Sequence, residues 1–289
     1  HDEILRSPAA QSAVRHPKNF SSQLEQAKLK AAEVRYTLGE QSLEQNTRES
    51  AKEAYYHFQR ADEIRPAYRD AQAQMRQARE MATVFVQVEP IPMHSRTFKL
   101  SNEFFENQVH EFLQTSGISP FVQFITPRDA QTYRQSPDHV VQLMFDDFVV
   151  GQTLVRERIH KRSRDSVVLG TVDVKENGET VTRDVYGTVE AEVHLFEKVV
   201  DSRGLLDMQI LDANSRSVLS QKKFGGSFTW REGWGFFNGD KRALTRDDQR
   251  ILRRRREVAD PSPQALFVEF TKPIYSDLTR YLRDYYRGF

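Results

Sequence analysis

Adjacent carboxylates are the first residues whose chemistry could be catalytic. Asp146 and Asp147 stand between two phenylalanines in a stretch that alternates like a strand. Neighbouring strand residues face opposite sides of a sheet, so at most one of the two acids could enter a given site. A glycosidase needs two carboxylates that flank the same bond. The pair therefore predicts a structural role and argues against a glycosidase site.

Other motifs for catalysis or cofactor binding are missing from the sequence. The eight histidines are scattered, and no two are spaced to share one helix face, so no metal site is expected. The chain contains no glycine-rich phosphate loop and no Gly-x-Ser-x-Gly elbow. It also contains no cysteine, which excludes cysteine nucleophiles and zinc ribbons. We therefore expect a non-enzymatic protein without a cofactor.

Aromatic side chains gather in residues 224–240, interspersed with glycines. Both tryptophans, Trp230 and Trp234, lie there together with Phe236 and Phe237. Flat rings beside flexible glycine turns could bind a glycan or anchor a protein partner. The alternative is that the rings fold back and close the open end of a sheet. We favour this second interpretation because large aromatic side chains are usually buried.

A basic run follows the aromatic segment. Its members are Arg250, Arg253, Arg254, Arg255 and Arg256. Such a cluster could bind the phosphates of lipid or lipopolysaccharide, or an acidic partner. Nearby acidic residues partly neutralise the run, so a solvated surface loop is the favoured interpretation. The whole chain has 42 basic and 41 acidic residues, and this balance argues against a nucleic acid partner.

The length of 289 residues predicts about two domains, at roughly 150 residues each. Residues 1–21 carry prolines and scattered charge without a period, which is typical of an arm or tether. Apolar residues then recur at helical spacing over residues 22–82 and predict three amphipathic helices. The longest uncharged stretch, residues 112–127, contains Gly117 and Pro120 and is too short to span a bilayer.

The helical segment carries a repeat-like pattern of small and large residues. The pattern consists of Leu38, Gly39, Ala54, Phe58, Ala61 and Pro66. This order resembles a tetratricopeptide repeat, in which small residues let two helices approach and a phenylalanine fills the space between them. The interval between Gly39 and Ala54 is longer than in that family, and Arg35 and Ser42 replace the usual aromatic residues. We interpret residues 22–82 as one divergent repeat followed by a capping helix.

From Thr83 the hydrophobic period changes from that of a helix to that of a strand. Residues 83–289 therefore predict a second unit, in which strand, helix, strand and short helix precede an antiparallel meander. Asn177-Gly178 is the strongest turn signal of this meander. A final aromatic helix starts after Ser262, and Pro273 predicts a kink or short break in it. The expected fold class is α+β, with an N-terminal helical hairpin, a mixed and largely antiparallel sheet packed by helices, and a C-terminal helix.

Several segments of residues 83–289 resemble one group of envelope proteins. They are the Val-rich strand ending in prolines at 84–92, the strand entering Gly151, and the paired strands 205–213 and 217–220. The group comprises curli-secretion lipoproteins, the lipoprotein activators of cell-wall synthases, and the amino-terminal domain of the Tol system's propeller protein. This chain departs from their pattern in the turn Asn214-Ser215-Arg216, which lacks the usual Thr-Gly.

As a whole, the chain is similar to Gram-negative envelope lipoproteins. The resemblance implies a periplasmic or surface location at the outer membrane, protein partners in an envelope assembly, and a lipid anchor on a cysteine preceding His1 in place of a spanning segment. The leading hypothesis is a non-enzymatic adaptor or scaffold for secretion or outer-membrane biogenesis. The alternative is glycan or peptidoglycan binding through Trp230 and Trp234 in support of cell-wall synthesis.

Overall fold

The computed structural model describes residues 20–92, 101–134, 136–176 and 179–289. The described elements are α3 (Ser21–Glu44), α4 (Arg48–Ile64), α5 (Ala71–Ala82), β1 (Val84–Val88), α6 (Glu103–Thr115), β2 (Val122–Ile125), α7 (Pro127–Tyr133), β3 (His139–Glu176), β4 (Glu179–Asp212), β5 (Val218–Gly239), η1 (Lys241–Ala243), α8 (Arg246–Ile251) and α9 (Pro263–Tyr286). This arrangement confirms the predicted α+β class and the mixed sheet. Most of the predicted arm, residues 1–19, lies outside the described residues.

Helices α3, α4 and α5 pack through small residues and one large ring. Thr47 and Ser50 form a capping box that starts α4, and the helix ends two residues before Pro66. Phe58 is fully buried against Gly39, where an added Cβ would lie 2.7 Å from the Phe58 ring. Only glycine leaves room for that ring. Ala54 and Ala61 are also fully buried, so the two helix backbones lie close together.

Leu38 does not share this packing, although the sequence pattern placed it there. The buried face of α3 is formed by Ala32, Tyr36, Gly39 and Ser42, which recur at helical spacing. Leu38 points away from that face and is 37% exposed. Pro66 is exposed as well and only follows the end of α4.

The sheet has the strand order β2-β1-β3-β4-β5. β1 is parallel to both β2 and β3, whereas β3, β4 and β5 form the antiparallel meander. The sequence predicted several separate strands in this region, and the structure instead has two very long ones. Where the alternation of β3 is irregular, its pairing register with β4 shifts, for example between Phe145 and Asp147 and between Arg164 and Val167. A β-bulge of this kind bends a strand without ending it.

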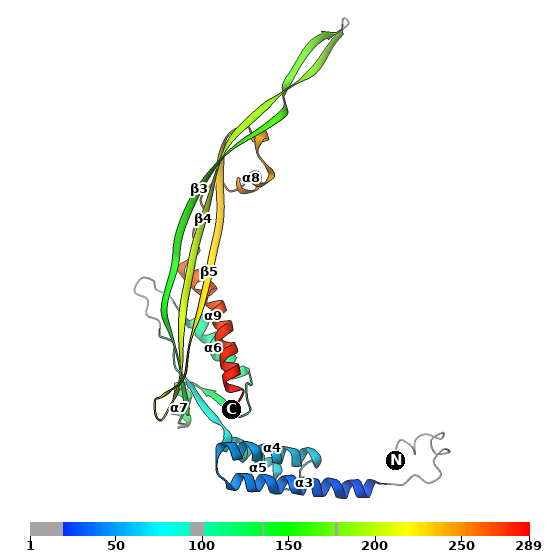
Figure 1. The fold of residues 1–289 in the computed structure, drawn as a ribbon, viewed down its shortest axis with the longest axis vertical. Coiled ribbons are helices and arrows are strands. Elements are labelled where there is room, and N and C mark those ends of the chain that lie inside the picture. The colour runs from blue at the N-terminus through cyan, green and yellow to red at the C-terminus, as the bar shows by residue number, and fades with distance from the viewer. Residues whose placement is uncertain (1–19, 93–100, 135, 177–178) are drawn as a thin grey trace, which may run out of the picture.

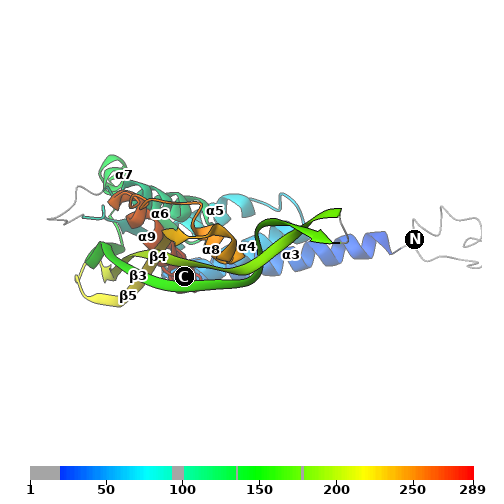
Figure 2. The same ribbon diagram turned by 90° about the horizontal axis from the view of Figure 1, so that it is seen from above.

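Helix α9 covers one face of the sheet, and α6 lies beside α9 (Figure 2). The buried stripe of α9 includes Phe267, Phe270, Ile274, Leu278, Leu282 and Tyr286. Gly226 allows this close approach, because an added Cβ would lie 2.1 Å from the backbone oxygen of Phe270. Of the kink or short break predicted at Pro273, the break is wrong, since α9 runs uninterrupted from Pro263 to Tyr286 with Pro273 inside it. Every helix of the described residues is too short or too polar to span a membrane.

Strands β3 and β4 extend well past the end of β5 (Figure 1). β5 ends at Gly239, opposite Ala191, and only two strands continue beyond that point. We call residues 164–176 and 179–189 the ribbon. The 38 residues of β3 span on the order of 120 Å, at about 3.3 Å per residue. The predicted turn Asn177-Gly178 lies outside the described residues, but its neighbours Glu176 and Glu179 are paired.

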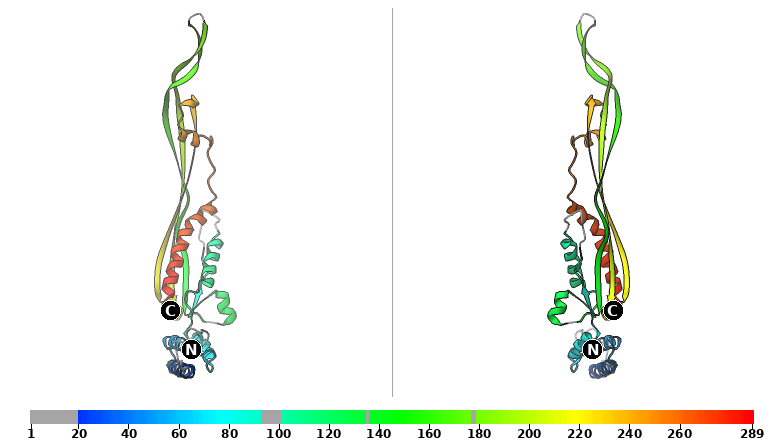
Figure 3. Two further views of the ribbon diagram at one scale, coloured as in Figure 1. Left: turned by 90° about the vertical axis from the view of Figure 1, so that its right-hand side faces the viewer. Right: turned by 90° about the vertical axis from the view of Figure 1, so that its left-hand side faces the viewer.

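The helices α3, α4 and α5 lie at the opposite end of the molecule from the ribbon (Figure 3). Arg48 of α4 forms an ion pair with Asp138, whose other carboxylate oxygen accepts the Phe85 amide at 2.9 Å. Ala51 and Phe121 are buried in a small cluster at the same junction. The helices are thus attached to the end of the sheet where β1 and β3 begin.

Candidate functional site

The four aromatic residues singled out in the sequence all lie on strand β5, within a continuous strand and not in glycine turns. Trp234 is only 8% exposed and stacks on Phe196 with a ring-centroid distance of 5.4 Å and an interplanar angle of 9°. Trp230 lies opposite Val200 and packs against the main core. Trp234 is therefore buried and Trp230 is partly buried, so the four rings do not form one open surface.

The two phenylalanines of this group face opposite sides of the sheet, as neighbouring strand residues do. Phe236 is 45% exposed and stacks on His194 at a ring-centroid distance of 4.5 Å. Phe237 packs against a second, smaller core with Val193 and Leu252. Of the four rings, Phe236 is the most exposed.

The basic run begins on α8 and continues in the segment that follows it. Arg250 forms an exposed ion pair with Asp247 at 3.4 Å. Arg254 forms an ion pair with Glu232, and its backbone oxygen accepts the Gly235 amide at 3.0 Å. This backbone bond places the run along the outer edge of β5. The basic and aromatic segments are therefore brought together by the fold.

A groove of about 620 Å³ lies where these segments meet. Its apolar lining comes from Phe236, Phe237, Leu244 and Leu252, and its cationic lining from Lys241, Arg253 and Arg255. No carboxylate lines it. Among the described residues, no acidic group lies within ion-pair distance of these three cations. Arg256, the last member of the basic run, is exposed but does not line the groove.

The wall of the groove is fixed by two ion pairs. Arg162 of β3 binds Asp248 of α8 through two hydrogen bonds and holds the pKa of that carboxyl well below its usual range. Asp240, just before η1, accepts hydrogen bonds from the Arg242 guanidinium and backbone amide, which lower the pKa of its carboxyl to about 2. Both acids therefore stay ionised at neutral pH.

The sequence missed Lys241 and the meeting of the two segments. The sequence did contain a signal for α8, because Thr245 and Asp248 have the spacing of a capping box and start this short helix. The signal does not show that α8 packs against the sheet, and this packing is what returns the chain to β5. Docking depends on tertiary contacts, and local patterns do not contain them.

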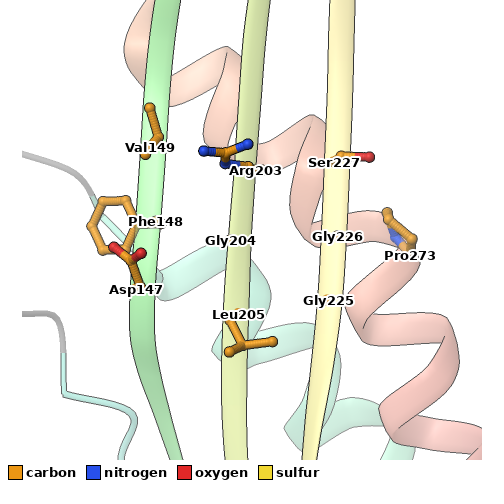
Figure 4. A pocket seen from close by; sticks show the side chains of 10 residues that line it. All are labelled: Asp147, Phe148, Val149, Arg203, Gly204, Leu205, Gly225, Gly226, Ser227 and Pro273. Atoms are coloured by element: carbon orange, nitrogen blue, oxygen red, sulfur yellow. The ribbon is translucent and has the colours of Figure 1, made fainter.

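A second hollow of about 540 Å³ is lined by residues of the adjacent strands β3, β4 and β5 (Figure 4). Asp147 and Arg203 are its charged residues, and glycines of β4 and β5 form its floor. The expectation that Asp146 and Asp147 face opposite sides is wrong, because the β-bulge after Phe145 interrupts the alternation. Asp146 instead forms an ion pair with Lys223 on the same open face.

This hollow offers no arrangement for acid-base catalysis by two carboxylates, since Asp146 is paired with a lysine and Asp147 is the hollow's one acid. Within the residues that the structure describes, no group of three or more histidine or acidic side chains could hold a metal ion.

Comparison of the sequence with models of known protein families and with curated proteins gives no match. One solved structure that resembles this chain is a neuraminyllactose-binding hemagglutinin homolog from Helicobacter pylori. It shares 9% sequence identity, and the match covers 70% of this chain and 84% of that chain with a TM-score of 0.30. A likeness this distant supports no argument about function.

Proposed function

We propose that this chain is a non-enzymatic adaptor subunit that binds a partner protein through the ribbon. The observation that carries the proposal is a two-stranded ribbon with exposed apolar side chains, which no third strand of the described residues covers. An isolated two-stranded hairpin is marginally stable in water. A ribbon of this length is therefore best explained as half of an interface.

The ribbon exposes large apolar side chains along its length. They are Val168 (39% exposed), Leu169 (53%), Val172 (47%), Val174 (37%), Val181 (39%), Val185 (42%) and Tyr186 (61%). The strand register places Val172, Val174, Val181 and Val185 on one face of the ribbon and Val168 and Tyr186 on the other. Exposed apolar side chains that gather on one face commonly mark a protein interaction site. Burial of such side chains by a partner would contribute roughly 25 cal/mol for each Å² removed from water.

Polar side chains of the ribbon are largely occupied with each other. Arg183 forms an ion pair with Glu176, and Thr182 donates to Asp173 at 2.7 Å. At the base of the ribbon, the Arg242 guanidinium donates to the Val168 carbonyl at 2.5 Å. Beyond this contact the outer edges carry rows of backbone groups that a partner strand can pair with.

The helices at the other end supply a rigid brace in this proposal. We infer that α3, α4 and α5 are a divergent tetratricopeptide-like module, and the close packing of Gly39 on Phe58 supports this inference. Helix α3 also leaves Leu24 and Val34 exposed, at 55% and 58%. A single repeat cannot form the long groove of a solenoid, so a bracing role suits it better than peptide capture.

The compartment is proposed from the sequence resemblance. We propose a lipid-anchored protein on the periplasmic side or surface of the outer membrane, working in secretion or outer-membrane biogenesis. The precursor sequence upstream of His1 tests this directly. An apolar segment that ends in small residues and a cysteine supports the proposal, and a precursor that lacks this segment contradicts it.

Shortening the ribbon tests the adaptor function. Arg164 and Val189 lie opposite each other, so an Asn-Gly turn can replace residues 165–188 and leave the rest of the sheet intact. We expect the shortened chain to fold normally but to lose the partner that co-purifies with the full chain from native membranes. A matched variant, Lys175→Gln with Glu179→Gln, should keep the partner. Equal recovery of the partner with the shortened chain would contradict the proposal.

Glycan binding through Trp230 and Trp234 has less support. A sugar-binding platform needs an open ring face, whereas Trp234 is stacked on Phe196 and Trp230 packs against the core. We therefore keep the adaptor as the leading proposal.

A further inference from the structure

The groove between β5 and α8 combines an apolar lining with unpaired positive charge. Ligand pockets are commonly roughly 300–1,000 Å³ in volume and mostly apolar, with a few placed polar groups. This groove of about 620 Å³ falls within that range of volume, but more of its lining is polar than apolar, so charged groups make up an unusually large share of its surface. Phe236 stands at its edge with 45% of its surface exposed, and Leu252, by contrast, is 9% exposed and packs against the sheet.

The charges on the groove are all of one sign. Lys241, Arg253 and Arg255 line it, and no carboxylate does. Elsewhere in the same region the cations have acidic partners: Arg242 binds Asp240, and Arg254 binds Glu232. Guanidinium groups bind phosphate oxygens with two parallel hydrogen bonds, and lysine adds a mobile point charge. The three unpaired cations therefore fit an anionic group.

The groove is also preformed. Arg162 holds α8 against β3, and Thr245 caps the helix through the amide of Asp248. Leu244 and Leu252 are almost completely buried on either side of α8. A preformed site spends little free energy on ordering its own side chains when a ligand enters.

We propose that this groove binds an amphiphile in which a phosphate group is joined to an acyl or alkyl chain, as in a phospholipid. The phosphate contacts Lys241, Arg253 and Arg255, and the chain lies on Phe237 and Leu252, which share the side of β5 that α8 covers. Neither a free phosphate nor an uncharged amphiphile satisfies both halves of the groove. The proposal is independent of the ribbon and of its partner.

Titration with three simple probes tests this site on the whole protein. Dodecyl phosphate carries both features, inorganic phosphate carries only the charge, and dodecyl maltoside carries only the chain. The two amphiphiles are used far below the concentrations at which they form micelles, and binding of all three probes is followed by calorimetry. We expect dodecyl phosphate to bind at least tenfold more tightly than either other probe.

Two variants then locate the binding. Lys241→Gln with Arg255→Gln should weaken dodecyl phosphate binding at least tenfold, whereas Arg256→Gln, from the same basic run but outside the groove, should leave it unchanged. Circular dichroism confirms that both variants fold. Equal binding of dodecyl maltoside, or of inorganic phosphate, would overturn the proposal, and so would an equal loss of affinity in the Arg256 variant.

Discussion

Arg162 of β3 and Asp248 of α8 are joined by two parallel hydrogen bonds. Nε donates to Oδ2 at 2.8 Å and Nη2 donates to Oδ1 at 3.0 Å. The Asp248 side chain is only 2% exposed, and that of Arg162 is 29% exposed. Because α8 has only six residues, it cannot persist on its own. This ion pair is therefore a main support of the groove beside β5.

Replacement of Asp248 by asparagine should release α8. We expect a loss of about 1–3 kcal/mol in the free energy of unfolding, because the partly buried Arg162 guanidinium loses its charged partner. Hydrogen exchange should rise in residues 246–252 and stay unchanged in α9. The matched control is Arg250→Gln, which removes an exposed pair and should change stability by less than about 0.5 kcal/mol. Equal effects of the two substitutions would contradict this role of Asp248.

The Asp248 carboxylate should also make the stability of the protein depend on pH. The ion pair with Arg162 lowers the pKa of Asp248 in the folded state. Its contribution to stability is therefore present above the unfolded pKa of about 3.9 and is lost as the pH falls toward the folded value. Denaturant titrations of the wild type and Asp248→Asn should converge as the pH is lowered below about 4. A constant difference between them at all pH values would contradict the assignment.

Substitutions at the contact between Gly39 and Phe58 should destabilise the helices α3, α4 and α5 locally. Gly39→Ala would place a Cβ 2.7 Å from the Phe58 ring and should cost about 1–3 kcal/mol. Phe58→Ala leaves a cavity and should cost about 3–5 kcal/mol. Both should lower helical circular dichroism before the sheet unfolds. Gly288→Ala, where an added Cβ meets nothing, is the control and should be near neutral.

His194 should titrate at an unusually high pH. Hydrogen bonds to Glu157 at 2.8 Å and Glu192 at 3.1 Å stabilise its charged form and raise its pKa. Its contribution to stability is fully present below the unfolded pKa of about 6.5 and is lost as the pH rises through the folded value. NMR titration of the ring should show Glu157→Gln lowering the pKa and Glu190→Gln leaving it unchanged. An unshifted histidine in the wild type would refute this reading of the contacts.

Fluorescence can check the structural role of the tryptophans. Trp230→Phe leaves Trp234 as the single emitter, and its stacking on Phe196 predicts blue-shifted emission and weak quenching by acrylamide. Peptidoglycan fragments and oligosaccharides should leave the spectrum unchanged. A saturable shift with any of these sugars would favour the glycan function instead.

The fold class was predictable from the sequence because its apolar patterns are strong. The stripe through Phe267, Phe270 and Ile274 has a helical period, and the alternation in β4 has the period of a strand. The continuity of β3 was not predictable, since bulges such as the one after Phe145 shift the alternation and imitate strand ends. Leu38 was also misjudged from the sequence. It matches a position of the repeat motif, but it lies on the exposed side of its helix.

The candidate groove was predictable only in parts. Phe236 and Arg255 were found from composition, but local sequence does not contain the tertiary contacts that bring them to one groove with Lys241. The burial of Trp234 also depends on a partner ring, Phe196, from another strand. Residues far apart in the chain therefore decided both which rings are open and which cations are unpaired.

Site-specific photocrosslinking tests the central claim most directly. Because the chain has no cysteine, Leu169→Cys introduces a single thiol on the ribbon, and Asn214→Cys introduces one in the exposed turn at the far end of the sheet. Both are labelled with a benzophenone maleimide and irradiated in native membranes. We predict a discrete adduct with a partner protein, or with a second copy of this chain, at position 169 and none at position 214. Absence of an adduct at position 169, or equal labelling at both positions, would contradict the proposal that the ribbon is the docking surface.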